Sequence, residues 1–325
     1  MVVASTYRIG SGYSRSLDAA GIADDALRSA FECCRRLHAD FGRTYYLATL
    51  LLPPAKRPYV NSLYGFARYA DEIVDNGAVE TRSAALVGWS VQALADIRAG
   101  RSADPVCRAL IHTVDRWGIS VDYFEAFLRS MNMDLTVTEY ATYSDLREYM
   151  YGSAAVIGLQ MVPILEPVTV EAYERAAALG EAFQLTNFVR DIAEDLVRGR
   201  IYLPMEDLDA FGVTRESLLA GVVDRPFTEL LKFEIDRIRR LYRYAEEGIA
   251  MLAPASRECI RTAFVLYSGI LDEVVKRDYQ ILDRRVAVGI GRRLGVAVPG
   301  YLRARREWRS AGIGVGQAVR SREEN

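Results

Sequence analysis

The chain has 325 residues and half of them are hydrophobic, so it is long enough to bury a large core. Its 41 basic and 43 acidic residues leave a formal charge of −2, which argues against a nucleic-acid-binding protein. Two histidines and four cysteines without a Cys-x-x-Cys spacing do not suggest a zinc site, and reduced thiols in a cytoplasmic protein are the simplest interpretation. Neither a signal peptide nor a run of about 18 apolar residues is present, so no spanning helix is predicted.

The predicted elements are helical almost throughout the chain. Residues 24–41, 170–199 and 227–253 each place apolar side chains at helical spacing with charges between them. The prolines mostly fall between such segments, and no linker rich in glycine, serine or proline divides the chain. We therefore predict an all-α protein with one domain at 21–300, between a flexible N-terminal segment, 1–20, and a charged C-terminal tail, 301–325.

Two stretches, RYADEIVDN at 68–76 and NFVRDIAEDLVRGR at 187–200, concentrate acidic residues within apolar helical sequence. Asp71 and Asp75 are four residues apart, as are Asp191 and Asp195, so each pair shares one helix face. Two such carboxylates repel each other unless a cation lies between them, and Mg²⁺ takes carboxylate and phosphate oxygens as ligands. The alternative is a solvated helix face, but the apolar neighbours favour a cavity whose mouth binds metal.

Arginines accompany both acidic stretches. Arg68 lies one turn before the first pair, while Arg190 and Arg200 flank the second; Arg198 is interpreted as the partner of a neighbouring acid. Carboxylates for a metal and arginines for phosphate oxygens are typical of a diphosphate site that neutralises a leaving group.

The segments YGFARYADEIVD, at 64–75, and FQLTNFVRDIAEDLVRGRIYLP, at 183–204, closely resemble the two signature segments of the squalene/phytoene synthase family, the head-to-head trans-prenyltransferases. FGRTYYLATLLLPP, REYMYGSAAVIG and LYSGILDEV resemble further family segments, so the resemblance spans roughly residues 35 to 280. Glu72 stands where many members have aspartate. Ser153 and Ala155 replace the usual valine and glycine, which affects the cavity expected around Tyr149 and Tyr151.

The resemblance implies the all-α isoprenoid synthase fold, a single helical bundle around a central hydrophobic cavity with both acidic motifs at its mouth. It implies an Mg²⁺-dependent prenyltransferase that condenses two geranylgeranyl diphosphates through prephytoene diphosphate to phytoene, a step of carotenoid biosynthesis. The alternative is a dehydrosqualene or squalene synthase that uses two farnesyl diphosphates. The run GIGRRLG at 289–295 is not a dinucleotide fingerprint, and no NADPH is expected.

The family pattern also implies roles for individual residues. Two or three Mg²⁺ ions are expected on Asp71, Asp75, Asn187, Asp191 and Asp195, and the four aspartates are counted as catalytic together with Tyr149. Substrate is expected to contact Arg43, Thr44, Tyr45, Arg68, Gln184, Asn187, Arg190, Arg200 and Tyr267. Tyr149 is a candidate acid/base group, with the departing diphosphate as the alternative proton acceptor. A dry, cation-stabilising lining is expected from Tyr45, Tyr64, Tyr149, Tyr151, Phe183, Phe188 and Tyr267, for each of which plain core packing is the alternative.

Other classes fit the residues less well. A class I terpene cyclase would carry an Asn-Asp, Ser/Thr and Glu triad where this chain has DIAED, and a non-catalytic helical relative would be expected to have lost the acid pairs. We expect a cytoplasmic protein. Peripheral membrane contact is inferred from the apolar product, and the arginines of the tail either contact anionic lipid or are solvated. The sequence does not predict the oligomeric state.

Overall fold

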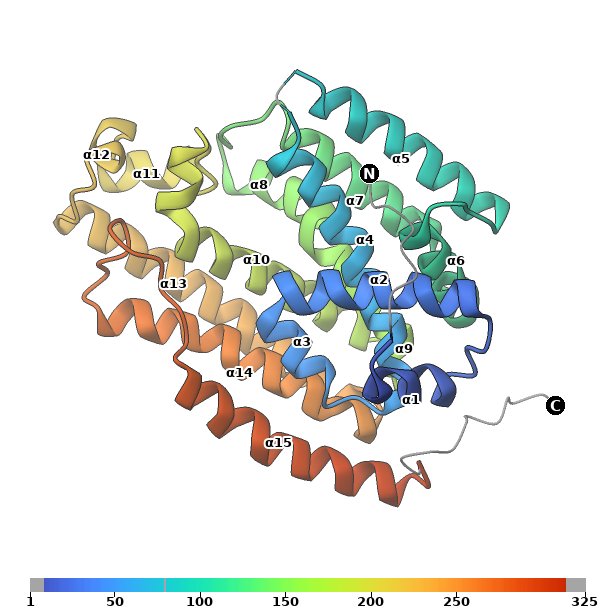
Figure 1. The fold of residues 1–325 in the computed structure, drawn as a ribbon. Coiled ribbons are helices and arrows are strands. Elements are labelled where there is room, and N and C mark those ends of the chain that lie inside the picture. The colour runs from blue at the N-terminus through green and yellow to red at the C-terminus, as the bar shows by residue number, and fades with distance from the viewer. Residues whose placement is uncertain (1–8, 79, 314–325) are drawn as a thin grey trace.

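The computed structural model describes residues 9–78 and 80–313, which form a bundle of helices (Figure 1). In the first half these are α1 (Ser11–Ala19), α2 (Asp25–Phe41), α3 (Arg43–Thr49), the 3₁₀ turn η1 (Pro54–Lys56), α4 (Arg57–Asn76), α5 (Arg82–Ala99), α6 (Pro105–Trp117), α7 (Val121–Met133), α8 (Tyr143–Met150) and the π-helical turn η2 (Tyr151–Ala155). In the second half they are α9 (Val156–Leu165), α10 (Ala172–Val197), α11 (Met205–Phe211), α12 (Arg215–Leu219), α13 (Arg225–Glu246), the 3₁₀ turn η3 (Glu247–Met251), α14 (Pro254–Lys276) and α15 (Ile290–Ser310). No β-strand occurs within the described ranges, only two isolated bridges, so the all-α prediction is confirmed.

Local sequence signals explain where many helices begin and end. Asp24 caps α2 by accepting a hydrogen bond from the Leu27 amide at 2.7 Å, and Asp104 and Asp224 cap α6 and α13 in the same way. Prolines lie in the first turn of α4, α6, α13 and α14, where their missing N–H costs nothing. Pro163 and Pro299 differ from the predicted pattern because they lie inside α9 and α15.

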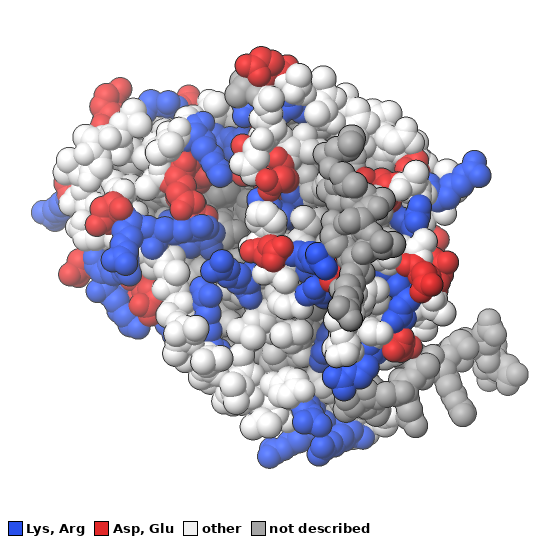
Figure 2. Space-filling model, viewed as in Figure 1, with Lys and Arg blue, Asp and Glu red and all other residues white. Residues whose placement is uncertain are grey.

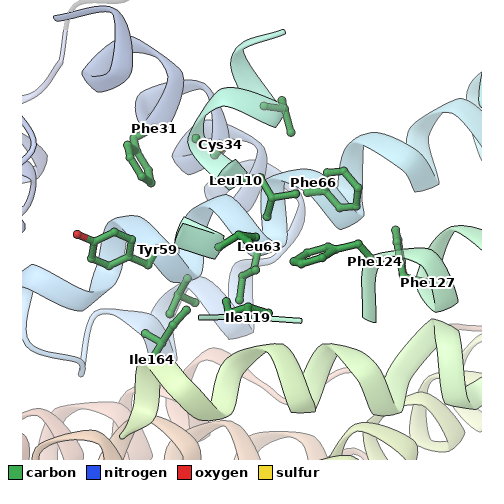
Figure 3. Packing of buried hydrophobic residues seen from close by; sticks show 14 of the residues in the cluster. Phe31, Cys34, Tyr59, Leu63, Phe66, Leu110, Ile119, Phe124, Phe127 and Ile164 are labelled. Atoms are coloured by element: carbon green, nitrogen blue, oxygen red, sulfur yellow. The ribbon is translucent and has the colours of Figure 1, made fainter. Parts of the chain in front are cut away.

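The core consists of two large apolar clusters. One joins α2, α4, α6 and α7 through aromatic rings, where Phe31 packs edge-on with Tyr59 and Phe66 packs edge-on with Phe124 (Figure 3). The other surrounds α10 and α13. Phe183, at the centre of α10, contacts both clusters and a smaller third one that contains Tyr267. The middle of α10 therefore lies at the junction of all three clusters.

Glycines allow α10 to lie close to α9 and to the preceding turn η2. A Cβ atom at Gly158 would lie 2.2 Å from the Ala176 carbonyl oxygen, and one at Gly180 would lie 2.4 Å from that of Ala154. Both distances are shorter than any real contact, so these two positions require glycine. The spacing of the helices beside the cavity depends on them.

Both expected terminal segments are partly helical. The predicted boundary at residue 300 falls within α15, which continues to Ser310 because Trp308 is buried and its Nε1 donates to the Ala255 carbonyl at 3.3 Å. At the other end α1 buries Leu17 completely. Residues 1–8 and 314–325, the rest of these segments, lie outside the described ranges. None of the helices that the structure describes is both long and apolar enough to cross a bilayer.

Candidate active site

A cavity of about 630 Å³ opens at the junction of the clusters, and both acidic stretches contribute to its lining. Asp71 and Asp75 come from α4, and Asp191 and Asp195 from α10. The residues predicted to act in catalysis, metal binding or substrate binding all line this one cavity: Arg43, Thr44, Tyr45, Arg68, Asp71, Asp75, Tyr149, Gln184, Asn187, Arg190, Asp191, Asp195, Arg200 and Tyr267. Helical periodicity aligned each pair, and tertiary packing brought the two pairs together.

On α4 the acidic side chains are held by arginines. Arg68 donates to both Asp71 and Glu72 on its own helix. Asp75 instead accepts from Arg198 at 3.0 Å and from Arg200 at 3.4 Å, both of which follow the second acidic stretch. Arg198 was expected to pair with a neighbouring acid; it does pair with an acid, but with one from the other stretch. Glu72 does not line the cavity, unlike the two aspartates.

On α10 the two aspartates differ in their partners. Asp191 accepts from Arg190 at 2.7 Å and from Arg285 at 2.8 Å. Within the described ranges Asp195 makes no side-chain hydrogen bond or ion pair, and its burial, followed by the charge of Asp191, raises its pKa to about 7. Asp195 is therefore the acid of the site that most lacks a positive partner.

In the pair on α4, the pKa of Asp71 is raised, as that of Asp195 is on α10. The surrounding protein and the charge of Asp75 raise the pKa of Asp71 to about 6, although 41% of its side-chain surface remains accessible from the cavity mouth. A bound cation would offset both the cost of keeping these carboxylates charged while partly buried and the repulsion between them.

The oxygen donors at the mouth fit a divalent metal whose coordination is completed partly by the protein and partly by the substrate. Among the described residues no group of three or more histidine, cysteine or acidic side chains lies close enough to hold a metal alone. The carboxylates instead form two pairs, and beside them the Asn187 Oδ1 is a buried oxygen with no hydrogen-bond partner in the described part of the chain. Mg²⁺ sites are commonly completed by water and phosphate oxygens, which this arrangement leaves room for.

A buried carboxylate beside Tyr149 was not identified from the sequence. Asp134, just after α7, accepts from the hydroxyl of Tyr149 at 2.9 Å and from that of Tyr202 at 3.0 Å, while Arg200 donates to its carbonyl at 2.8 Å. Burial raises the pKa of Asp134 to about 6 and that of Tyr149 well above its ordinary value. Asp134 has no second acid at helical spacing, so no local sequence pattern indicated it. Arg285, which also lines the cavity, was missed because it too belongs to no such pattern.

Tyr151 was wrongly expected in the lining. Its side chain is 49% exposed and absent from the cavity, whereas Tyr149 is buried in it. Residues two apart on a helix point to nearly opposite faces, a signal that could have separated the two. Ser153 lines the cavity with a buried hydroxyl that has no partner in the described ranges, and Ala155 is buried outside it.

A second, mostly apolar cavity of about 290 Å³ extends from the first and shares Tyr45, Tyr64 and Gln184 with it. Its walls include Val60, Leu63, Met161, Leu165, Ala176, Leu179, Ile249, Leu252 and Ala263. Aromatic rings stand where the two meet: Tyr45 and Tyr267 stack at 4.5 Å, and Phe183 lies 4.7 Å from Tyr267. Of the other expected rings, Tyr64 and Phe188 also line the first cavity.

The comparisons with known proteins agree with this geometry. The family model described as squalene/phytoene synthase matches residues 38–292. The chain is similar to a phytoene synthase of Arthrospira platensis, at 38% identity over 85% of this chain and 94% of that protein, and to a 15-cis-phytoene synthase of Synechocystis sp., at 36% identity over 86% of each. It also resembles the crystal structure of a dehydrosqualene synthase in complex with ligand, with a TM-score of 0.79, 28% identity and coverage of 86% of this chain and 98% of that one. The expected isoprenoid synthase fold is confirmed.

Proposed function

The chain belongs to the squalene/phytoene synthase family, and we propose that it is a prenyltransferase that joins two geranylgeranyl diphosphates head to head to give phytoene. The relatives named phytoene synthase, of which the chain covers most of the length, support this product over the thirty-carbon alternatives. The observation that carries the proposal is the juxtaposition of two acid pairs with arginines at the mouth of an apolar cavity.

The arginines supply the positive charge that a diphosphate requires. Arg43, Arg68, Arg190 and Arg200 all line the mouth. Burial of Arg190 acts to lower its pKa, but its hydrogen bond to Asp191, the charge of that carboxylate and Tyr267 together outweigh this effect, so its pKa is raised and it stays charged. A planar guanidinium binds phosphate oxygens through two hydrogen bonds, so these side chains suit a leaving group that gains charge as its C–O bond breaks.

The apolar cavity suits the remaining chemistry. Loss of the first diphosphate leaves an allylic cation, which the double bond of the second substrate attacks to give a cyclopropylcarbinyl diphosphate and release a proton. Loss of the second diphosphate is followed by ring rearrangement and loss of another proton, which yields the triene. The stacked rings of Tyr45 and Tyr267 exclude water and present π faces, each worth up to about 2 kcal/mol to a desolvated cation.

Asp71, Asp75, Asn187, Asp191 and Asp195 would hold Mg²⁺, and we propose two or three ions. When bound, Mg²⁺ would act as a Lewis acid that neutralises the departing diphosphate. The raised pKa values of Asp71 and Asp195 support this assignment, as does the Asn187 oxygen, which has no hydrogen-bond partner within residues 9–78 and 80–313. NADPH is not part of the proposed reaction.

We propose that Tyr149 is the acid/base group that takes part in proton transfer during the reaction. Its hydroxyl donates to Asp134, and its ring lies against Tyr140 and Tyr202 at centroid distances of 5.3 and 5.8 Å. These contacts hold the phenol in one orientation in the cavity wall. The departing diphosphate is the alternative proton acceptor.

The test is to incubate the purified chain and Mg²⁺ separately with farnesyl and geranylgeranyl diphosphate, each with and without NADPH, and to identify the hydrocarbon. We expect phytoene from the longer substrate without NADPH. Dehydrosqualene or squalene from the shorter substrate, with no turnover of the longer, would contradict the proposal.

The proposed location is the cytoplasm with peripheral membrane contact, because a forty-carbon hydrocarbon partitions into lipid rather than water.

A further inference from the structure

Helix α15 presents a continuous apolar face to solvent. Its exposed large apolar residues occur at helical spacing over three turns: Ile290 (78% exposed), Leu294 (53%), Val298 (55%), Tyr301 (39%) and Leu302 (56%). We call these five residues the apolar stripe. The adjoining face, which carries Ala297, Gly300, Ala304 and Trp308, is buried against the bundle, where α15 packs on α14. Nothing in the described ranges covers the stripe.

This grouping of exposed apolar side chains on one helix is unusual for the surface of the protein. Elsewhere the exposed large apolar residues are spread over several helices and loops, such as Val91 on α5 and Val170 before α10. Single exposed apolar residues are normal, whereas a contiguous patch indicates a contact with another apolar phase.

Positive charge follows the stripe along the same helix. α15 carries six arginines, Arg292, Arg293, Arg303, Arg305, Arg306 and Arg309, against one acid, Glu307. Arg292 and Arg303 pair with acids of α14, but Arg306 and Arg309 are exposed and form no ion pair within the part of the chain that the structure describes. Figure 2 shows this lower edge of the molecule white over the start of α15 and blue toward its end. Apolar residues followed by arginines match a helix that lies in the interface of an anionic bilayer.

The stripe begins beside the cavity mouth. Val286, Ala287 and Val288, which precede α15, line the cavity, as does Arg293 in its first turn. Val296 packs against the small cluster that contains Tyr267. A bilayer that touched the stripe would therefore lie next to the opening.

We propose that α15 docks on an anionic lipid bilayer, with the apolar stripe in the acyl-chain boundary and Arg306 and Arg309 on headgroup phosphates. The docking places the cavity mouth at the membrane surface. If the proposed function holds, the hydrocarbon product passes from the cavity into the bilayer without crossing water.

The test is flotation of the full chain with vesicles of phosphatidylcholine, either pure or mixed with phosphatidylglycerol. We expect binding to the mixed vesicles and a fall of at least about tenfold in the bound fraction at equal lipid for the variant L294E/V298E/L302E. The matched control V91E/V168E/V170E adds the same charge at three other exposed valines and should bind like the unsubstituted chain. R306Q/R309Q should weaken binding to the mixed vesicles selectively.

Thermal melts of each variant establish that it is folded, and turnover in detergent micelles establishes that its active site is intact. Equal binding of the stripe variant and its control, or no binding of the unsubstituted chain, would overturn the proposal. A dimer in sedimentation that L294E/V298E/L302E abolishes would also overturn it, because a second copy would then cover the stripe. Vesicle binding is measured without substrate, so failure to form phytoene leaves this result intact and rejects only the proposed function.

Discussion

The two parts of the central cavity differ in charge: the mouth, which is the cavity of about 630 Å³, is lined by many charged side chains, whereas the depth, which is the apolar cavity of about 290 Å³, is lined by few. The mouth gathers four aspartates and several arginines, whose unequal pairing leaves Asp195 without a hydrogen-bond or ion-pair partner for its side chain among the described residues. In the depth the charged side chain is Arg175, which is engaged by Glu247 at 2.9 Å, and burial lowers the pKa of His38 to about 4, so that it is neutral. We therefore propose that ionisation takes place at the mouth and that the depth limits the length of the prenyl chain.

The largest expected effect comes from removing charge at the mouth. Asp191→Ala should lower kcat by a factor of about 10³ or more, because it removes a proposed metal ligand and frees Arg190 and Arg285. Glu72→Ala is the matched control from the neighbouring acid outside the cavity, and should cost less than about tenfold. Both are measured as phytoene formed at saturating Mg²⁺. Equal, mild losses would show that the mouth does not use its aspartates for metal.

A smaller loss of activity is expected from a substitution of Asp134, the buried carboxylate beside Tyr149. Asp134→Asn should lower kcat by about ten- to a hundredfold with little change in KM, because the Tyr149 hydroxyl loses a charged acceptor at 2.9 Å. Tyr202→Phe removes the other donor to the same carboxylate and serves as the control, with a loss below about tenfold. A KM change alone would assign Asp134 to substrate binding rather than to positioning Tyr149.

Filling the depth should change specificity rather than chemistry. Ala263→Phe places a large ring in the apolar cavity and should lower kcat/KM for geranylgeranyl diphosphate by about ten- to a hundredfold relative to farnesyl diphosphate. Ala84→Phe, on the exposed surface of α5, should change neither value. Equal losses for both substrates would indicate that this part of the cavity does not measure chain length.

The smallest effect concerns buried charge outside the cavity. Glu234 on α13 is fully buried beside Arg237 and Asp207, and burial raises its pKa to about 8. The folded state thus holds this proton more tightly than the unfolded chain. Relative to Glu234→Gln, the stability of the unsubstituted protein should be greatest below about pH 4.5 and decline as the pH rises to about 8. Thermal melts of both proteins from pH 5 to 9 measure the difference; a constant gap would show that Glu234 stays ionised throughout.

The sequence was sufficient to predict the helices and the partners within each of them. Asp71 with Asp75, and Asp191 with Asp195, follow from 3.6 residues per turn, and the residues that the family segments implied for metal and substrate all line the cavity, although Tyr151 does not. These relations are local or repeat at fixed spacing, so they are readable along the chain.

Contacts between distant segments depended on how the apolar faces pack. Arg198 meets Asp75 across 123 positions of the sequence, and Tyr202 meets Asp134 across 68. The exposed face of α15 became apparent in the same way, once its other face was seen to be covered by the bundle. Such contacts require the crossing of particular helices, which helical periodicity does not specify because it describes one helix at a time.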